Sequence, residues 1–183
     1  MFLIIEGIHD VGKTTLINSI CKKIHFHQFS CRRSIPQLSQ SKNIDISNFA
    51  LGANCSIVYF SQFSNILDII FDRLHLSEFA YSQVMRNCSH KEAIKKFKAI
   101  DEKLAYPHVK LIYLSADIKI IIDRTKQRNK SFELEQTLAL IHSLQEAFEE
   151  STIPKLALNT ENSIDFLTNE VIKFIDADIS PLL

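Results

Sequence analysis

The sequence predicts an α/β fold, with a five-stranded parallel sheet flanked by helices on both faces. Two observations lead to this prediction. Short apolar runs alternate with longer segments whose apolar residues recur at helical spacing, and a glycine-containing loop directly follows the first run. The chain has 183 residues, of which 46% are hydrophobic and 23% charged. Because this size and composition suit one core, we expect residues 1–183 to form a single domain.

The apolar runs supply the expected strands, which cover residues 2–5, 27–31, 67–71, 109–114 and 155–158. The first run, Phe2-Leu3-Ile4-Ile5, is apolar at successive positions, as expected of a parallel strand that is buried on both faces. The run at 27–31 is the least apolar of the five.

Helices are expected between these strands, wherever apolar residues recur three or four positions apart. The ranges are about 13–24, 48–64, 76–85, 91–105, 117–127, a segment ending near 150, and 164–175. The stretch 32–45 is polar and contains Pro36, so we expect a loop there.

Charge and composition exclude several classes of protein. Lys and Arg number 21, as do Asp and Glu, so the formal net charge is zero. Nucleic acid is therefore an unlikely partner, because dedicated nucleic-acid binders carry a basic excess. No apolar run approaches the ~20 residues of a membrane helix. We accordingly expect no membrane association.

The start of the chain and the cysteines indicate a cytoplasmic protein. The opening apolar run is short and lacks a preceding basic region, so we expect no signal peptide. The four cysteines (Cys21, Cys31, Cys55 and Cys88) form no C-x-x-C pair. We interpret them as reduced thiols.

A phosphate-binding loop is the strongest functional motif. Residues 7–14, Gly-Ile-His-Asp-Val-Gly-Lys-Thr, fit G-x-x-x-x-G-K-[ST] and hold two of the three glycines in the chain. An expected strand precedes them and an expected helix follows, which is the context that the motif requires. An ordinary strand–turn–helix is the alternative interpretation.

The chemistry of such a loop comes mainly from its backbone. Glycines permit a close approach of phosphate, and successive N–H groups at a helix N-terminus form an anion-binding nest. We expect Lys13 to reach the β- and γ-phosphates of ATP and the Thr14 hydroxyl to bind Mg²⁺. The residues assigned to ATP in this segment are Gly7, Val11, Gly12, Lys13, Thr14 and Thr15.

Asp72-Arg73 directly follows an expected strand and is a second candidate site. A carboxylate at the end of a buried strand can hold Mg²⁺ through water, and the adjacent guanidinium can bind a phosphate with two hydrogen bonds. Because ligands of parallel sheets bind at the carboxyl ends of strands, we expect this pair near the loop. A surface ion pair is the alternative.

A basic run is the third candidate. Arg124 and Arg128 are four residues apart on an expected helix, so both can face one way, and Lys126 and Lys130 lie beside them. Positive charge stabilises a phosphoryl group during transfer. A solvated helix end is the alternative, since cations are favoured near a helix C-terminus.

Together these motifs resemble the thymidylate kinase family of P-loop nucleoside monophosphate kinases. The family has a strand followed by Glu-Gly and the loop, as here, and a D-R-Y-x-x-S-x-x-A-Y-Q motif. Asp72, Arg73, Ser77, Ala80 and Tyr81 occupy matching places in that motif. The D-R-x-H-L-S-E-x-x-Y form at 72–81 is also similar to kinases encoded by bacteriophages, which would place the protein in the cytoplasm of a host cell.

The resemblance implies that the γ-phosphoryl group of ATP is transferred to a deoxynucleoside monophosphate. Arg73 would hold the acceptor phosphate, Ser77 would support the acceptor pocket, and Tyr81 would lie against the deoxyribose. Arg124 and Arg128 would close over ATP as part of a lid at about 124–134. The resemblance also places Asn159 near adenine and implies a homodimer, for which the 48–64 helix could serve; a buried core helix explains that segment equally well.

Several positions depart from the family pattern. His9 stands in place of the acidic third loop residue, on the acceptor side, with Asp10 next. Leu74 and Ser82 replace a Tyr and a Gln. The R-E-P-G-G-T segment is absent, and Arg32 or Arg33 in the substituted stretch could meet the acceptor phosphate.

Base recognition also departs from the family, because the 48–64 helix has no Arg-x-x-His pair. The acceptor base could instead rest on Phe63 or Tyr59, an inference made from position alone.

Other functions remain open. A deoxynucleoside kinase would need a general base, typically a carboxylate, at the end of the second strand, where Gln28, Ser30 and Cys31 stand. A kinase acting on modified bases in DNA is a further enzymatic alternative. A GTPase-like switch protein would carry an N-K-x-D motif, but Asn129-Lys130 is followed by Ser-Phe. A non-catalytic relative is the last alternative.

Overall fold

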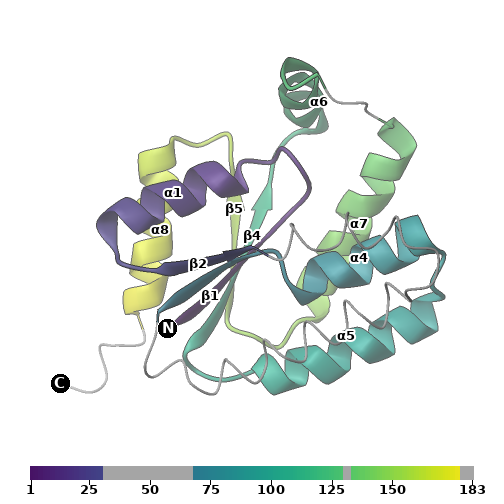
Figure 1. Ribbon diagram of the computed structural model, residues 1–183, viewed down its shortest axis with the longest axis horizontal. Helices are drawn as coiled ribbons and strands as arrows, with labels where there is room; N and C mark the ends of the chain where they lie inside the picture. Colours follow the sequence, from purple (N-terminus) through teal and green to yellow (C-terminus); the bar gives the residue numbers. More distant parts are fainter. Residues whose placement is uncertain (31–67, 130–132, 178–183) are drawn as a thin grey trace.

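A computed structural model describes residues 1–30, 68–129 and 133–177. Five strands in these ranges form one sheet in the order β2-β3-β1-β4-β5, and every neighbouring pair is parallel (Figure 1). The strands are β1 Phe2–Glu6, β2 His27–Ser30, β3 Ile69–Asp72, β4 Val109–Ser115 and β5 Lys155–Asn159. The sequence prediction of a five-stranded parallel sheet is confirmed.

Helices cover both faces of this sheet, as predicted (Figure 1). They are α1 Lys13–Lys23, α4 His75–Arg86, α5 His90–Leu104, α6 Ile118–Gln127, α7 Leu134–Glu150 and α8 Ile164–Asp176. Helices α1 and α8 pack together on one face, while α4 packs against α5 and α7 on the other. The remaining helix, α6, lies beyond the edge at which the strands end.

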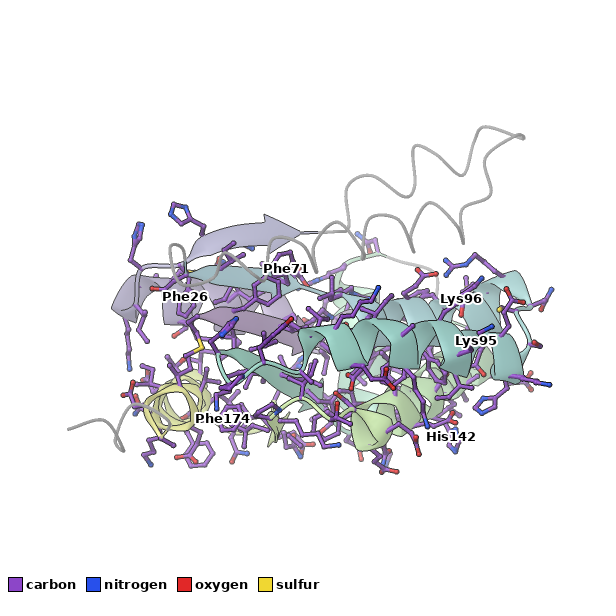
Figure 2. All side chains as sticks on the ribbon, turned by 90° about the horizontal axis from the view of Figure 1, so that it is seen from below. Phe26, Phe71, Lys95, Lys96, His142 and Phe174 are labelled. Carbon is purple, nitrogen blue, oxygen red and sulfur yellow. The ribbon has the colours of Figure 1, made fainter. Side chains whose placement is uncertain are left out.

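The core follows from the apolar runs and stripes of the sequence. All of β1 is fully buried, because it is the middle strand with helices on each side. Phe71 of β3, labelled in Figure 2, packs on Phe2 of β1 with ring centroids 4.5 Å apart. On α8, Phe174 lies with its ring 4.9 Å from Nζ of Lys110, a buried lysine of β4.

Helices α5, α6 and α8 begin at short polar side chains that accept a hydrogen bond from the first turn. Ser89 accepts a hydrogen bond from the N–H of Glu92 at the start of α5, and Ser163 accepts one from Phe166 at the start of α8. Asp117 caps α6 in a similar way, accepting from Lys119.

Sequence expectations and structure agree element by element where both exist. Strand β3 begins at Ile69 rather than at residue 67, and α4 begins at His75, one residue before the expected start. The expected 32–45 loop and 48–64 helix lie outside the described residues.

Within the described ranges no helix is long and apolar enough to cross a membrane. Cys21 and Cys88 are free thiols, and burial raises the pKa of each.

The strand register brings the candidate residues to one edge. Ile5 lies beside Asp72, and Ser115 lies beside Asn159. Since the phosphate-binding loop begins two residues after Ile5, the loop, the Asp72-Arg73 pair and the end of β5 share the carboxyl edge of the sheet.

Candidate functional site

The loop between β1 and α1 has the backbone that its glycines predict. Gly7 and Gly12 have φ of +140° and +116°, which side-chain-bearing residues rarely adopt. A Cβ on Gly7 would also lie 2.5 Å from the carbonyl oxygen of Leu114 in β4. Gly7 is therefore required both for the turn and for the close approach of the loop to the sheet.

Lys13 lies folded under this loop. Its Nζ donates to the carbonyl oxygens of Gly7 and Ile8, at 2.8 and 2.7 Å, and only 4% of the residue is exposed. Thr14 and Thr15 follow in the first turn of α1 with exposed side chains.

Asp72 and Arg73 are buried at the end of β3, with 5% and 7% of each residue exposed. The backbone of Arg73 turns with φ of +74°, and its N–H donates to the Ile5 carbonyl at 3.0 Å. Its Nη1 donates to the Tyr81 hydroxyl at 2.8 Å, and the guanidinium carbon lies 5.3 Å from the Tyr81 ring centroid. Tyr81 thus anchors one edge of the guanidinium.

Three buried side-chain atoms of this pair have no hydrogen-bond partner among the described residues. These atoms are Arg73 Nε, Arg73 Nη2 and Asp72 Oδ1. Buried polar atoms are normally hydrogen-bonded, and leaving a charged one unpaired is costly. A buried cation and a buried carboxylate that still have hydrogen-bonding atoms to offer, at the ligand-binding edge of a parallel sheet, form a candidate ligand site.

Glu6 holds the start of α4 and was not singled out from the sequence. This fully buried carboxylate accepts from the N–H groups of Leu74 and Ser77, at 2.7 and 3.2 Å, and from the Ser77 hydroxyl at 2.5 Å. The Glu-Gly pair at the strand end was the only signal for Glu6 in the sequence.

The carboxylate of Glu6 also affects a neighbouring tyrosine. Burial, and then the nearby carboxylates of Glu6 and Glu149, raise the pKa of Tyr113 to about 12.

Two arginines connect α6 to the loop. Arg124 Nη1 donates to the Val11 carbonyl at 2.9 Å and to the Thr160 hydroxyl at 3.1 Å, and its Nη2 donates to the Thr160 carbonyl at 3.3 Å. Arg128 Nη1 lies 2.6 Å from Asp10 Oδ1. The structure thus places both predicted arginines beside the phosphate-binding loop.

The other predicted residues lie around this edge or outside the described ranges. His9 is half-buried in the loop. Asn159 is exposed at the end of β5, where its side chain accepts from the N–H of Glu161 and donates to its carboxylate. Arg32, Tyr59 and Phe63, together with residues 130–132 of the expected lid, lie outside the described residues. The described part of the chain holds no cluster of three or more His, Cys, Asp or Glu side chains suited to a metal ion.

A second cluster of buried polar side chains connects α4 to α5 and to the segment after α7. Asp101 of α5 accepts from His75 Nε2 at 2.9 Å, from the Ser151 hydroxyl at 2.6 Å, and from the N–H and hydroxyl of Thr152 at 2.7 and 2.8 Å. Burial by itself raises the pKa of Asp101, but the hydrogen bonds and the positive charge of His75 outweigh it and lower that pKa to about 2. The His75 ring also stacks on Phe97, with centroids 5.3 Å apart.

Comparison with known proteins shows the fold. No protein-family profile and no curated protein matches the sequence. Among solved structures, deoxyadenosine kinase from M. mycoides with bound dATP is 20% identical, with a TM-score of 0.70 over 96% of this chain and 100% of that one. The same enzyme with products dCMP and dCDP is 18% identical, with a TM-score of 0.68 over 97% and 100%.

A third solved structure is similar to a comparable degree. YorR protein from Bacillus subtilis, in complex with phosphorylated GDP, is 17% identical, with a TM-score of 0.72 over 97% of both chains. The described part of the chain therefore shares the α/β fold, with its five-stranded parallel sheet, of these kinase structures.

Proposed function

We propose that the protein transfers the γ-phosphoryl group of ATP to a deoxynucleoside monophosphate. One observation carries this proposal: Arg73 is buried beside the phosphate-binding loop, and its Nε and Nη2 have no hydrogen-bond partner among the described residues. Guanidinium stays protonated in proteins and offers paired N–H groups that match the oxygens of a phosphate. An acceptor phosphate would satisfy both atoms.

The loop supplies the donor side of the proposed site. Its N–H groups and the N-terminus of α1 would hold the triphosphate, and Lys13 would move from the Gly7 and Ile8 carbonyls to the β- and γ-phosphates. The donor side of the site would also include Gly12, Val11 and Thr15, and Asn159 would lie near adenine. Phosphoryl transfer needs positioning and charge neutralisation rather than a covalent intermediate, and these groups provide both.

The residues present also fit a magnesium ion. Asp72 Oδ1 is buried without a partner, and the Thr14 hydroxyl lies exposed at the start of α1. A cluster of three acidic or imidazole ligands is not required, because Mg²⁺ usually takes one or two protein oxygens with substrate phosphates and waters. When bound, the ion would neutralise charge on the donor phosphates.

The acceptor side of the proposal rests on α4. Tyr81 would both anchor Arg73 and lie against the deoxyribose, and Ser77 would support the pocket through its bond to Glu6. His9, Arg32 and Phe63 stay predictions for acceptor binding. The implied homodimer also stays a prediction, which light scattering on the purified protein would check.

A deoxynucleoside kinase is the second candidate, because solved structures of a deoxyadenosine kinase share this fold. In that reaction a carboxylate would accept the proton of the sugar hydroxyl. Strand β2 ends at Ser30, beside Asp72 in the register, and supplies no carboxylate itself. Asp72, with Oδ1 unpartnered, is the described carboxylate that could take this role.

The experiment is a screen of purified protein with ATP and Mg²⁺ against the deoxynucleosides and their 5′-monophosphates. We expect diphosphate products from at least one monophosphate. Products from nucleosides alone would replace the proposal by the second candidate, and no transfer to either class would refute both.

Lys13→Ala serves as the negative control in this screen. We expect the variant to lose at least about a thousandfold in kcat, a typical cost of removing a charge that stabilises the transition state, while its far-UV circular dichroism stays that of the wild type. Wild-type turnover in this variant would show that the loop is not the donor site.

A further inference from the structure

Asp10 occupies an unusual position for a carboxylate. It lies in the middle of the phosphate-binding loop with φ of +58°, a left-handed conformation that Asp tolerates better than most residues. Its side chain is fully buried. A buried negative charge in a loop that binds negative phosphates would weaken binding unless a cation neutralises it.

The carboxylate of Asp10 is directed to α6. Oδ1 accepts from Arg128 Nη1 at 2.6 Å, and Oδ2 accepts from the Thr125 hydroxyl at 3.2 Å. Thr125 is itself buried, and its single hydroxyl hydrogen is shared between Asp10 and the Ile121 carbonyl, which lies 2.8 Å away. The two oxygens of Asp10 therefore contact the last turn of α6 and the C-cap residue that follows it, across 115 and 118 residues of sequence.

Arg124 and Arg128 differ in how they are held. Arg124 donates to the carbonyl of Val11 and to the hydroxyl and carbonyl of Thr160, all neutral groups. Arg128 is held by a charge-assisted bond at one end, and 55% of its side chain stays exposed. A guanidinium has five N–H donors, so Arg128 can keep its bond to Asp10 and still offer donors to a second anion.

We propose that Asp10 is a positioning residue that fixes Arg128 over the nucleotide phosphates. This inference rests on the proposed function, because it takes the triphosphate of ATP as the second anion. The pair removes the negative charge of Asp10 from the loop and orients the guanidinium before the nucleotide arrives. ATP then binds a preformed arrangement and does not have to order a long side chain.

The test is a double-mutant cycle of Asp10→Asn and Arg128→Gln. Affinity for a fluorescent ATP analogue with Mg²⁺ and the steady-state constants are measured on the full chain. Loss of one charge-assisted hydrogen bond costs about tenfold or more, so we expect each single variant to raise the Kd and the KM for ATP about tenfold. We expect the double variant to be no worse than Arg128→Gln, because Asp10 acts through Arg128. The KM of the acceptor should not change.

Asp123→Asn is the matched control, since it removes an exposed carboxylate from the same helix; we expect wild-type values. Additive losses in the cycle, or an Asp10→Asn variant that binds ATP like the wild type, would overturn the inference. Failure of the wild type to bind the analogue would instead overturn the proposed function and the inference with it.

Should Asp10→Asn not fold, Asp10→Glu replaces it in the same cycle. This variant keeps the charge but moves the carboxylate by one methylene, so the guanidinium is displaced. We expect the same lack of additivity with Arg128→Gln, and additive effects would again contradict the inference.

Discussion

Two buried charged clusters lie at the start of α4, and they differ in how far the protein satisfies them. Asp101 receives four hydrogen bonds, from His75, Ser151 and Thr152. Among the described residues, His75 Nδ1 is the one buried side-chain atom of that cluster without a hydrogen-bond partner. Within the same ranges, the guanidinium of Arg73 donates to Tyr81, while Arg73 Nε, Arg73 Nη2 and Asp72 Oδ1 have no partner.

This difference distinguishes charged residues that have a structural role from charged residues that bind a ligand. The Asp101 cluster connects α4 to α5 and to the segment after α7, and both carboxylate oxygens of Asp101 are hydrogen-bonded. Arg73 instead has two buried guanidinium nitrogens without a partner among the described residues. Leaving a charged group unpaired is costly, and such a cost is expected where a ligand completes the site.

The largest effect is expected from Arg73→Met. This change replaces a buried cation by an apolar side chain of similar length, with the same positive φ. We expect kcat/KM for the acceptor to fall about a thousandfold or more, as for loss of a buried charged phosphate contact. Stability to urea should be unchanged or higher, because an unpaired buried charge is removed. Loss of stability with retained activity would show that Arg73 has a structural role, and would contradict the difference inferred between the two clusters.

Asp101→Ala should show the opposite behaviour. The donors of His75, Ser151 and Thr152 would lose their acceptor, and breaking such a buried polar cluster costs roughly 3–5 kcal/mol. We expect this loss in the free energy of unfolding, measured by urea denaturation, with kcat within a few-fold of the wild type under conditions in which the variant is folded. A fully stable but inactive variant would place Asp101 in the functional site instead.

Acid should reveal the same cluster in the wild-type protein. The pKa of Asp101 is lowered from 3.8 to about 2 on folding, so its contribution is complete above about pH 4 and is lost as the pH falls through about 2. That shift corresponds to about 2 kcal/mol. We expect wild-type stability to fall by about this amount more than that of Asp101→Asn over the same pH range. Parallel curves for the two proteins would contradict the assignment.

The smallest effect is expected from Tyr81→Phe. The variant keeps the ring under the guanidinium but removes the hydroxyl that accepts from Arg73 Nη1. We expect the acceptor KM to rise about three- to tenfold, the value of one hydrogen bond, with little change in stability. A loss as large as that of Arg73→Met would show that the hydroxyl itself contacts substrate.

Local patterns were sufficient to predict most of the fold. Phe2–Ile5 could be recognised as a buried strand because its apolar residues are consecutive, and the ends of α5 and α8 followed from apolar spacing. The motif predicted that Gly7 and Gly12 adopt backbone conformations that other residues rarely adopt. Asp72 and Arg73 could be selected because they follow an apolar run, although their unpaired atoms could not be seen from the sequence.

Long-range polar contacts could not be predicted in the same way. Nothing in the local sequence links Asp10 to Arg128, or Glu6 to Ser77, because hydrogen bonds between distant residues leave no periodic signal. His75 and Asp101 lie on different helices and were missed for the same reason. Ser77 was selected for the acceptor pocket, and only the structure shows that its hydroxyl donates to Glu6.

Interactions between residues close in the sequence were enough to predict the described strands and helices and the loop between β1 and α1, because hydrophobic periodicity and glycine conformation act over a few neighbouring residues. Which charges are satisfied depends instead on contacts between distant residues. Asp101 receives four hydrogen bonds and Asp10 pairs with Arg128, whereas buried atoms of Asp72 and Arg73 have no partner among the described residues. The reason is that hydrogen bonding requires the whole fold to bring two atoms within about 3 Å, and the unpartnered atoms lie at the edge where ligands of such sheets bind.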